Sequence, residues 1–154
     1  MLKKEHFIRA KKQLLVLVVC LALVLPAAFF VYRAAGERER EAVLKAAREF
    51  LDAEIRRDYA AVYACFASSS PYVRSHSYDE YLAQAKSFTD RVSDYRIVAV
   101  SYIQNNKDRE TYPAVEKVAQ VEVDVTFLHE ETNSHSEMNI GFIFFKEQGK
   151  WYKS

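Results

Sequence analysis

The sequence predicts an α+β domain that follows an N-terminal transmembrane helix. Residues Leu14 to Tyr32 contain no charged side chain, and about 20 apolar residues in a helix span the hydrocarbon core of a bilayer. After this run, apolar residues recur first at helical spacing and then in alternation with polar residues, as in strands. Helices followed by consecutive strands are typical of helices packed on one face of an antiparallel sheet.

The apolar run is longer than the core of a cleavable signal peptide, which has about 7–15 residues. Its small residues Ala27 and Ala28 directly follow Pro26, an unfavourable setting for a cleavage site. Proline is tolerated within a membrane helix. The sequence therefore favours an uncleaved signal anchor at residues 13–33, and cleavage is the alternative.

Charge indicates the orientation of this anchor. Residues 1–12 contain five Lys or Arg and one Glu, a net charge of +4, so the remaining residues carry −3 of the chain's total of +1. Short basic segments stay in the cytoplasm. We therefore expect residues 1–12 to be a cytoplasmic tail and residues 34–154 to be a periplasmic or extracellular domain, or a lumenal one if the host has organelles. A domain with a negative net charge is not expected to bind nucleic acid.

Helical periodicity covers the first half of this domain. Val43 and Phe50 belong to an apolar stripe that follows a solvated, charged first turn, which we interpret as a stalk helix. Asp58 is a candidate N-cap for the second helix, and Ser77 or Asp79 for the third. The predicted helices are residues 37–57, 59–66 and 78–92.

The second half of the domain has the alternation of strands. Residues 119–127 alternate most clearly, with Ala119, Val121, Val123, Val125 and Phe127 on one face. A polar loop precedes this strand, another follows it, and a turn containing Gly149 precedes the end of the chain. The predicted strands are residues 96–103, 119–127, 138–145 and a short last strand from Trp151.

Four segments of the domain combine aromatic and other residues at recognisable spacing. They are Ala47-x-x-Phe50-Leu51, Asp58-Tyr59-x-x-Val62-Tyr63-x-x-Phe66, Ser77-Tyr78-x-x-Tyr81-Leu82 and Phe144-Phe145-Lys146-Glu147-x-Gly149-Lys150-Trp151-Tyr152. Together they resemble the nuclear transport factor 2-like (cystatin-like) superfamily, and more narrowly its small membrane-anchored bacterial members of unassigned function. The resemblance implies a cone-shaped domain, in which about three helices pack on a curved, mainly antiparallel sheet around a conical cavity.

Motifs for catalysis, metals and cofactors are weak. Glu122 and Asp124 lie on the polar face of the clearest strand, and an acid that faces water keeps an ordinary pKa and gains nothing as a general base. His129 and His135 are spaced six apart, which does not suit a metal pair, so a solvated loop is the favoured interpretation. Cys65 is interpreted as a core residue. We therefore expect no catalytic residue, no metal site and no cofactor.

Two strands are apolar on both faces, and large exposed apolar patches mark interfaces. One face covers the helices, and the other is available for self-association or for a protein partner. The candidate interface residues are Val98, Val100, Tyr102, Ile143 and Phe145.

The expected function is non-catalytic. We expect a membrane-anchored scaffold or assembly module of an envelope complex, a homo-oligomer or a protein bound to an envelope partner, which acts through protein–protein contacts. The alternative is the binding of a small apolar ligand or lipid in the cavity of the domain. A cavity enzyme of the isomerase type, which the superfamily also contains, is the least favoured hypothesis.

Overall fold

A computed structural model describes the backbone of residues 2–103 and 110–154, and the side chains of Leu25 and of residues 29–103 and 110–154. The chain divides into two compact units, Met1–Glu39 and Arg40–Ser154. One helix, α1 (Leu2–Arg56), supplies all of the described first unit and the beginning of the second.

The first unit corrects the predicted fold class. Most of the predicted signal anchor, residues 13–24 and 26–28, lies outside the residues whose side chains are described. Across the described residues, no helix is long and apolar enough to cross a membrane. The physical reason is that Arg33 and the charged residues 37–41 soon follow the apolar residues that are described. Within the described residues, the structure shows an α+β fold of helices and four antiparallel strands, without the predicted transmembrane helix. The location of the domain outside the cytoplasm stays a prediction.

The second unit begins with the C-terminal part of α1, which ends in a Schellman-type turn. The amide of Arg57 donates to the carbonyl of Glu54, and the amide of Asp58 donates to the carbonyl of Ala53, each at 3.0 Å. Arg57 has a φ of 53°, in the left-handed region that glycine usually occupies at this position. The turn redirects the chain into the next helix.

Three short helices follow, each with a side-chain cap. They are α2 (Tyr59–Ala64), α3 (Pro71–Ser75) and α4 (Tyr78–Ser87). Asp58 caps α2 and Ser77 caps α4, and Ser77 and Glu80 form a capping box. Two of the differences from the prediction concern α3 and the start of β1. Helix α3 falls in a predicted loop, where Pro71 at the first turn favours a helix, and residues 90–92 are strand instead of helix.

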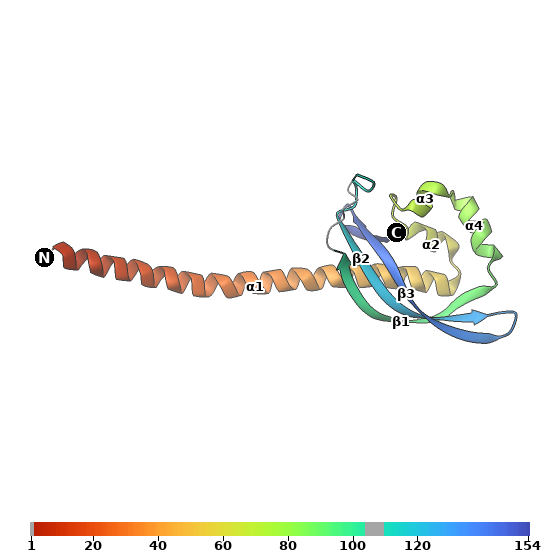
Figure 1. Ribbon diagram of the computed structural model, residues 1–154, viewed down its shortest axis with the longest axis horizontal. Helices are drawn as coiled ribbons and strands as arrows, with labels where there is room; N and C mark the ends of the chain where they lie inside the picture. Colours follow the sequence, from red (N-terminus) through yellow and green to blue (C-terminus); the bar gives the residue numbers. More distant parts are fainter. Residues whose placement is uncertain (1, 104–109) are drawn as a thin grey trace. The chain divides into compact units, whose positions relative to one another are not determined.

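Four antiparallel strands form one sheet in the described part of the chain, in the order β1-β2-β3-β4. They are β1 (Asp90–Ile103), β2 (Lys117–His129), β3 (Ser134–Glu147) and β4 (Lys150–Lys153). An isolated parallel bridge joins Phe66 to Lys153. Figure 1 shows β1, β2 and β3 as long, strongly bent strands beside the C-terminal part of α1.

The core lies between α1 and one face of this sheet. Of the β2 residues that alternation predicts to be buried, Ala119, Val121, Val123 and Val125 are completely buried, whereas Phe127 is half-buried. They pack with Val43, Ala47 and Leu51 of α1 and with Phe144 of β3. A second, smaller cluster lies elsewhere and consists of Ala67, Val115 and Phe145, with Tyr112, Val118, Ile143 and Tyr152 packed around them.

Candidate functional site

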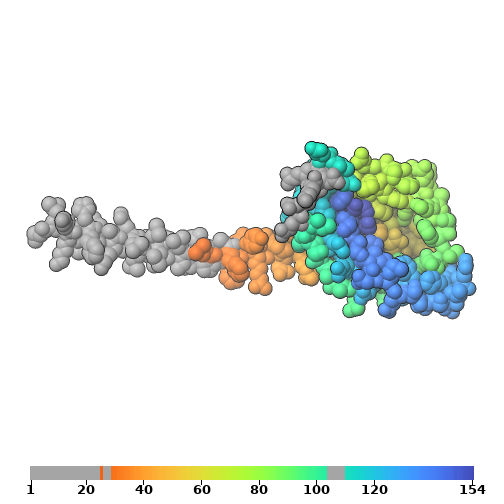
Figure 2. Space-filling model, viewed as in Figure 1, coloured from red at the N-terminus to blue at the C-terminus, as the bar shows by residue number. Residues whose placement is uncertain are grey.

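A cavity of about 350 Å³ opens where α1 ends, between the short helices and the beginning of β1. Figure 2 shows a hollowed surface beside α4, in green, and α4 supplies Tyr81, Gln84 and Ala85 to the lining. The lining comes from the four helices α1 to α4, from β1 and β2, and from the loops between them. The lining residues are Glu54, Arg57, Tyr59, Phe66, Tyr72, Tyr81, Gln84, Ala85, Phe88, Asp90, Arg91, Val92 and Phe127.

Three aromatic rings form a connected wall of the cavity. Phe66 stacks on Tyr72 with ring centroids 5.4 Å apart, and Tyr81 meets Tyr72 edge-on at 6.1 Å. The hydroxyl of Tyr72 donates a 2.7 Å hydrogen bond to Oε1 of Gln84. Aromatic pairs in these geometries are favourable beyond the area they bury, so this wall is held in place before any ligand enters.

Glu54 is the ionisable group that stands out in this cavity. It is half-buried, and burial raises the pKa of its carboxyl above the ordinary value. Within the described part of the chain, its carboxylate makes no hydrogen bond and no ion pair. Burial, followed by the charge of Glu54, raises the pKa of Tyr81. The cavity therefore contains a carboxylate whose charge the protein does not neutralise.

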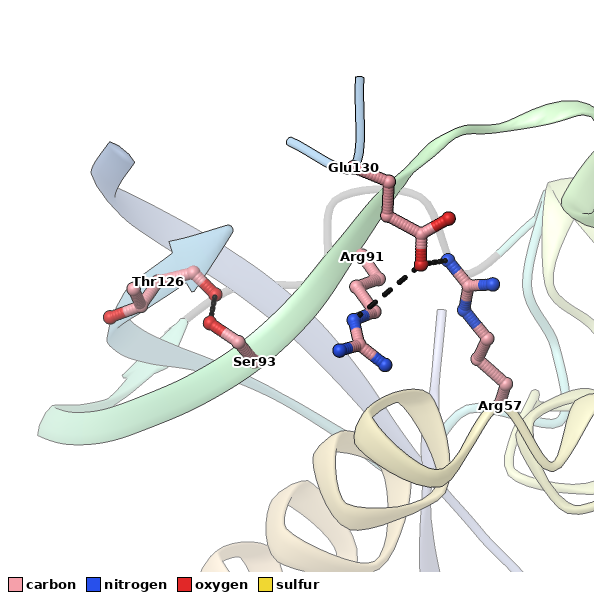
Figure 3. A network of polar contacts seen from close by, with 5 residues as sticks. All are labelled: Arg57, Arg91, Ser93, Thr126 and Glu130. Carbon is pink, nitrogen blue, oxygen red and sulfur yellow. Dashed lines mark hydrogen bonds and ion pairs between the residues drawn. The ribbon is translucent and has the colours of Figure 1, made fainter. Parts of the chain in front are cut away.

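The rim of the cavity carries compensated charges. Oε1 of Glu130, from the turn between β2 and β3, lies 2.7 Å from Nη2 of Arg57 and 3.6 Å from Nε of Arg91 (Figure 3). Nδ1 of His129 lies 2.9 Å from Oδ2 of Asp90. These side chains are partly exposed, so solvent screens each pair.

Two irregular features place the rim residues. Arg57 occupies its position in spite of a left-handed backbone, and its guanidinium reaches Glu130. At the first bulge of β1, the hydroxyl of Ser93 donates to the carbonyl of Thr126 at 3.1 Å (Figure 3). This hydrogen bond keeps β1 attached to β2 at the bulge, close to Arg91.

A second hollow, of about 420 Å³, lies beside Ala46, Cys65 and Trp151. The charged groups on its lining include Lys45 and Glu49, which pair with each other on the exposed face of α1. Nε1 of Trp151 is buried without a hydrogen-bond partner among the described residues. This nitrogen has almost no accessible surface, so it does not offer a donor to the hollow.

The five predicted interface residues do not share one face of the sheet. Val98 lies at the second bulge of β1 and is 48% exposed. Val100 packs against the main core, and the ring of Tyr102, 41% exposed, lies 6.2 Å from that of Trp151. Ile143 and Phe145 belong to the smaller cluster, where Phe145 is only 7% exposed.

The bulge between Ile97 and Ala99 explains this separation. Ile97 pairs with Val123, and Ala99 pairs with Glu122, so the alternation of β1 shifts by one residue at Val98. A one-residue shift moves every later side chain to the other face. An interface formed by these five residues stays a prediction, with Val98 and Tyr102 as its most exposed members.

The structure also shows where the histidines and the cysteine of the weak sequence motifs lie. His129 bonds to Asp90 and to Oγ of Ser136, while His135 is exposed on β3. No group of three potential metal ligands occurs among the described residues. Burial, and then the charges of Glu49 and Glu54, raise the pKa of Cys65, which keeps this thiol in its unreactive form.

Sequence reasoning missed Glu54 and Arg57. Glu54 follows Ala47 by seven residues and Leu51 by three, so helical spacing places it on the apolar face of α1. That spacing is the signal that identifies a carboxylate facing the core. Nothing comparable marks Arg57, because its role depends on Glu130, which lies 73 residues later.

Comparisons with known proteins support no family assignment. No family model matches the chain, and no curated protein matches it. The chain is similar to a crystal structure of a protein of unknown function with a cystatin-like fold from Nostoc punctiforme PCC 73102. The two are 17% identical with a TM-score of 0.47, and the match covers 74% of this chain and 84% of the other. At this identity and TM-score the similarity carries no argument about this chain, so the function must be argued from the site.

Proposed function

We propose that residues 40–154 form a non-catalytic domain that binds a small, largely apolar molecule in the cavity beside Glu54. The observation that carries this proposal is the 350 Å³ cavity with a preformed aromatic wall. Ligand pockets typically have about 300–1,000 Å³, a mostly apolar lining and a few polar groups. The volume and the lining both meet that description. Membership of the nuclear transport factor 2-like superfamily is part of this proposal, and the antiparallel sheet beside α1 supports it.

Ligand binding fits the geometry better than assembly through the sheet. An assembly module needs an apolar outer face, yet Phe145, the most buried of the predicted interface residues, is covered by Tyr112, Val115 and Ala67 of the same chain. In contrast, the described residues that line the cavity at the end of α1 leave it open. The cavity therefore offers apolar area that is still available to another molecule.

A cavity-filling substitution tests the proposal. Ala85 of α4 lines the cavity, whereas Ala60 of α2 is exposed and is not among the lining residues. We expect Ala85→Trp to reduce the binding of the neutral dye prodan, followed by fluorescence, at least about tenfold. Ala60→Trp is the matched control and should bind the dye like the wild type. Thermal unfolding of both variants establishes that they fold.

Val92→Trp, at a lining position on β1, gives a second blocking variant if Ala85→Trp does not fold. Equal dye binding by wild type, control and both blocked variants would show that the dye binds elsewhere. No dye binding by the wild type, with the fold intact, would also contradict the proposal.

Assembly through β1 is a second candidate because of one observation. Val98 and Ile103 are 48% and 43% exposed on β1, which is an edge strand of the sheet, and exposed edge strands can pair with another chain. Light scattering of residues 40–154 over a concentration series tests this candidate. A concentration-dependent dimer that Val98→Glu abolishes would support it, and a strict monomer would contradict self-association.

A further inference from the structure

We propose that the ligand of this cavity is an organic cation, an amine or quaternary ammonium group on a small apolar body, which binds between the carboxylate of Glu54 and the aromatic wall. This inference rests on the proposed function, because it names the chemical class that the same cavity accepts. It follows from the charges around the cavity, the rings beside Glu54 and the polar groups that have no partner.

The only lining charge without a partner within the described residues is negative. Arg57 and Arg91 both pair with Glu130, and Asp90 lies against His129. Glu54 has no such partner. A half-buried carboxylate loses hydration and receives nothing in exchange, and burial accordingly raises its pKa. A bound cation would supply the missing opposite charge.

Two of the rings that line the cavity suit a cation. Tyr59 and Tyr81 line it, and no described ring is stacked on either of them. Phe66 and Tyr72 complete the wall but stack on each other, and Tyr72 also stacks on His76. The negative face of an aromatic ring attracts cations, most strongly where water is excluded. The chain already uses this interaction, since Nζ of Lys153 lies 5.8 Å from the centroid of Phe66 and 6.0 Å from that of Phe142. Lys153 itself is not among the residues that line the cavity.

An anionic ligand fits the same residues less well. It would have to displace Glu130 from Arg57 and Arg91, and these pairs lie at a rim that is screened by solvent. It would also lie in one small cavity with the uncompensated carboxylate of Glu54, and like charges in a partly buried site repel strongly. A neutral apolar ligand would fit the space but would leave Glu54 without a partner.

A pair of isosteric probes tests the charge of the ligand directly. Choline and 3,3-dimethylbutan-1-ol have the same shape and the same hydroxyl, but the second has carbon in place of the charged nitrogen. We expect NMR titration of the full chain to give an affinity for choline about tenfold higher than for the alcohol, as expected for one partly desolvated charge interaction. The chemical shifts should move at Tyr59, Tyr72 and Tyr81.

Two substitutions on α1 separate the role of Glu54 from a general effect of charge. Glu54→Gln keeps the shape of the side chain and should remove the preference for choline. Glu49→Gln, on the exposed face of the same helix, changes the net charge equally and should keep it. Tyr59→Leu keeps an apolar lining without the aromatic face, and should weaken choline binding more than alcohol binding.

The outcomes distinguish this inference from the proposed function. Equal affinities for both probes, blocked by Ala85→Trp, would overturn the cation inference and leave ligand binding intact. A preference for choline that persists in Glu54→Gln would also overturn it. If neither probe binds and prodan does not bind, both the inference and the proposed function fail.

Discussion

The core has a filled part and an open part, and the same helix and the same strand run through both. In the filled part, Val43 and Ala47 of α1 meet Val121 and Val123 of β2, and all four are completely buried. In the open part, α1 presents Glu54 and β2 presents Phe127, and both line the cavity. Small aliphatic side chains pack at close range without leaving space. At the other end, large aromatic rings and the ionisable side chain of Glu54 line the cavity and leave room for a ligand.

The largest expected difference is between two phenylalanines from these two parts. Phe144 is 1% exposed in the filled core, whereas Phe88 is 64% exposed at the cavity. We expect Phe144→Ala to lower the free energy of unfolding by about 3–5 kcal/mol, and Phe88→Ala to lower it by less than about 1 kcal/mol. Urea unfolding measures both. Similar losses would show that the cavity end is as tightly packed as the core.

The second prediction compares two carboxylates. Glu147 is 5% exposed and accepts hydrogen bonds from the hydroxyls of Ser68 and Ser69, whereas Glu54 has no partner within the described residues. We expect Glu147→Gln to cost about 1–2 kcal/mol, because buried donors lose a charged acceptor. Glu54→Gln should not destabilise the protein at neutral pH, because it removes an uncompensated charge.

The stability of Glu54→Gln relative to wild type should depend on pH, and the direction follows from the pKa of Glu54. The folded-state pKa of Glu54 lies above the ordinary value of 4.5, so the folded protein binds more protons than the unfolded chain between these two values. The contribution of Glu54 to wild-type stability therefore falls as the pH rises through this window. The stability of Glu54→Gln relative to wild type should increase from pH 4.5 upward in urea unfolding. A difference that does not change with pH would contradict the burial of this carboxylate.

Lys153 is expected to show a smaller effect with the opposite sign. Burial lowers the pKa of Lys153 from 10.5 to about 8, so above pH 8 the folded protein loses this proton before the unfolded chain does. Stability from this group should rise with pH between 8 and 10.5, on the order of 1 kcal/mol after allowance for solvent screening. Lys153→Met should lack this rise, and Lys86→Met, at an exposed position of α4, should keep it. Urea unfolding at pH 7.5 and 9.5 provides the measurement.

The smallest effect concerns the turn that begins the open part. Arg57→Gly should relieve the strain of the left-handed backbone, which stabilises the protein by about 0.5–1 kcal/mol. It should also lose an exposed ion pair, which destabilises the protein by a similar amount. Its net effect on the free energy of unfolding is therefore expected to be close to zero. Arg57→Ala keeps the strain and loses the pair, so it should be the less stable of the two in urea. If alanine proved more stable than glycine, the backbone would not be strained here.

Regular patterns in the sequence predicted most of the fold. The alternation in residues 119–127 identified β2 and its buried face, and the helical stripe from Val43 to Leu51 identified the part of α1 that contacts the core. Both patterns extend over many residues and both elements lie in the middle of the core, so local periodicity and burial agree. The predicted transmembrane helix was wrong within the described residues.

The predictions were less accurate where single residues interrupt a pattern. The bulge at Val98 reverses the alternation of β1, and so separates Val100 and Tyr102 from Ile143 and Phe145. Its position depends on hydrogen bonds to β2, which the sequence of β1 alone does not specify. The candidate site was missed for a related reason, because its lining comes from segments spread over residues 54–127.

The sequence by itself determined the α+β class of the domain, the face of β2 that is buried and the net charge that disfavours nucleic acid. These properties depend on composition and on periods of two and 3.6 residues, which a single segment already contains. Only the tertiary structure decided that Phe145 is covered, that Arg57 and Arg91 share Glu130, and that Glu54 faces a cavity. Each of these depends on contacts between segments far apart in the chain, and local sequence patterns do not specify such contacts.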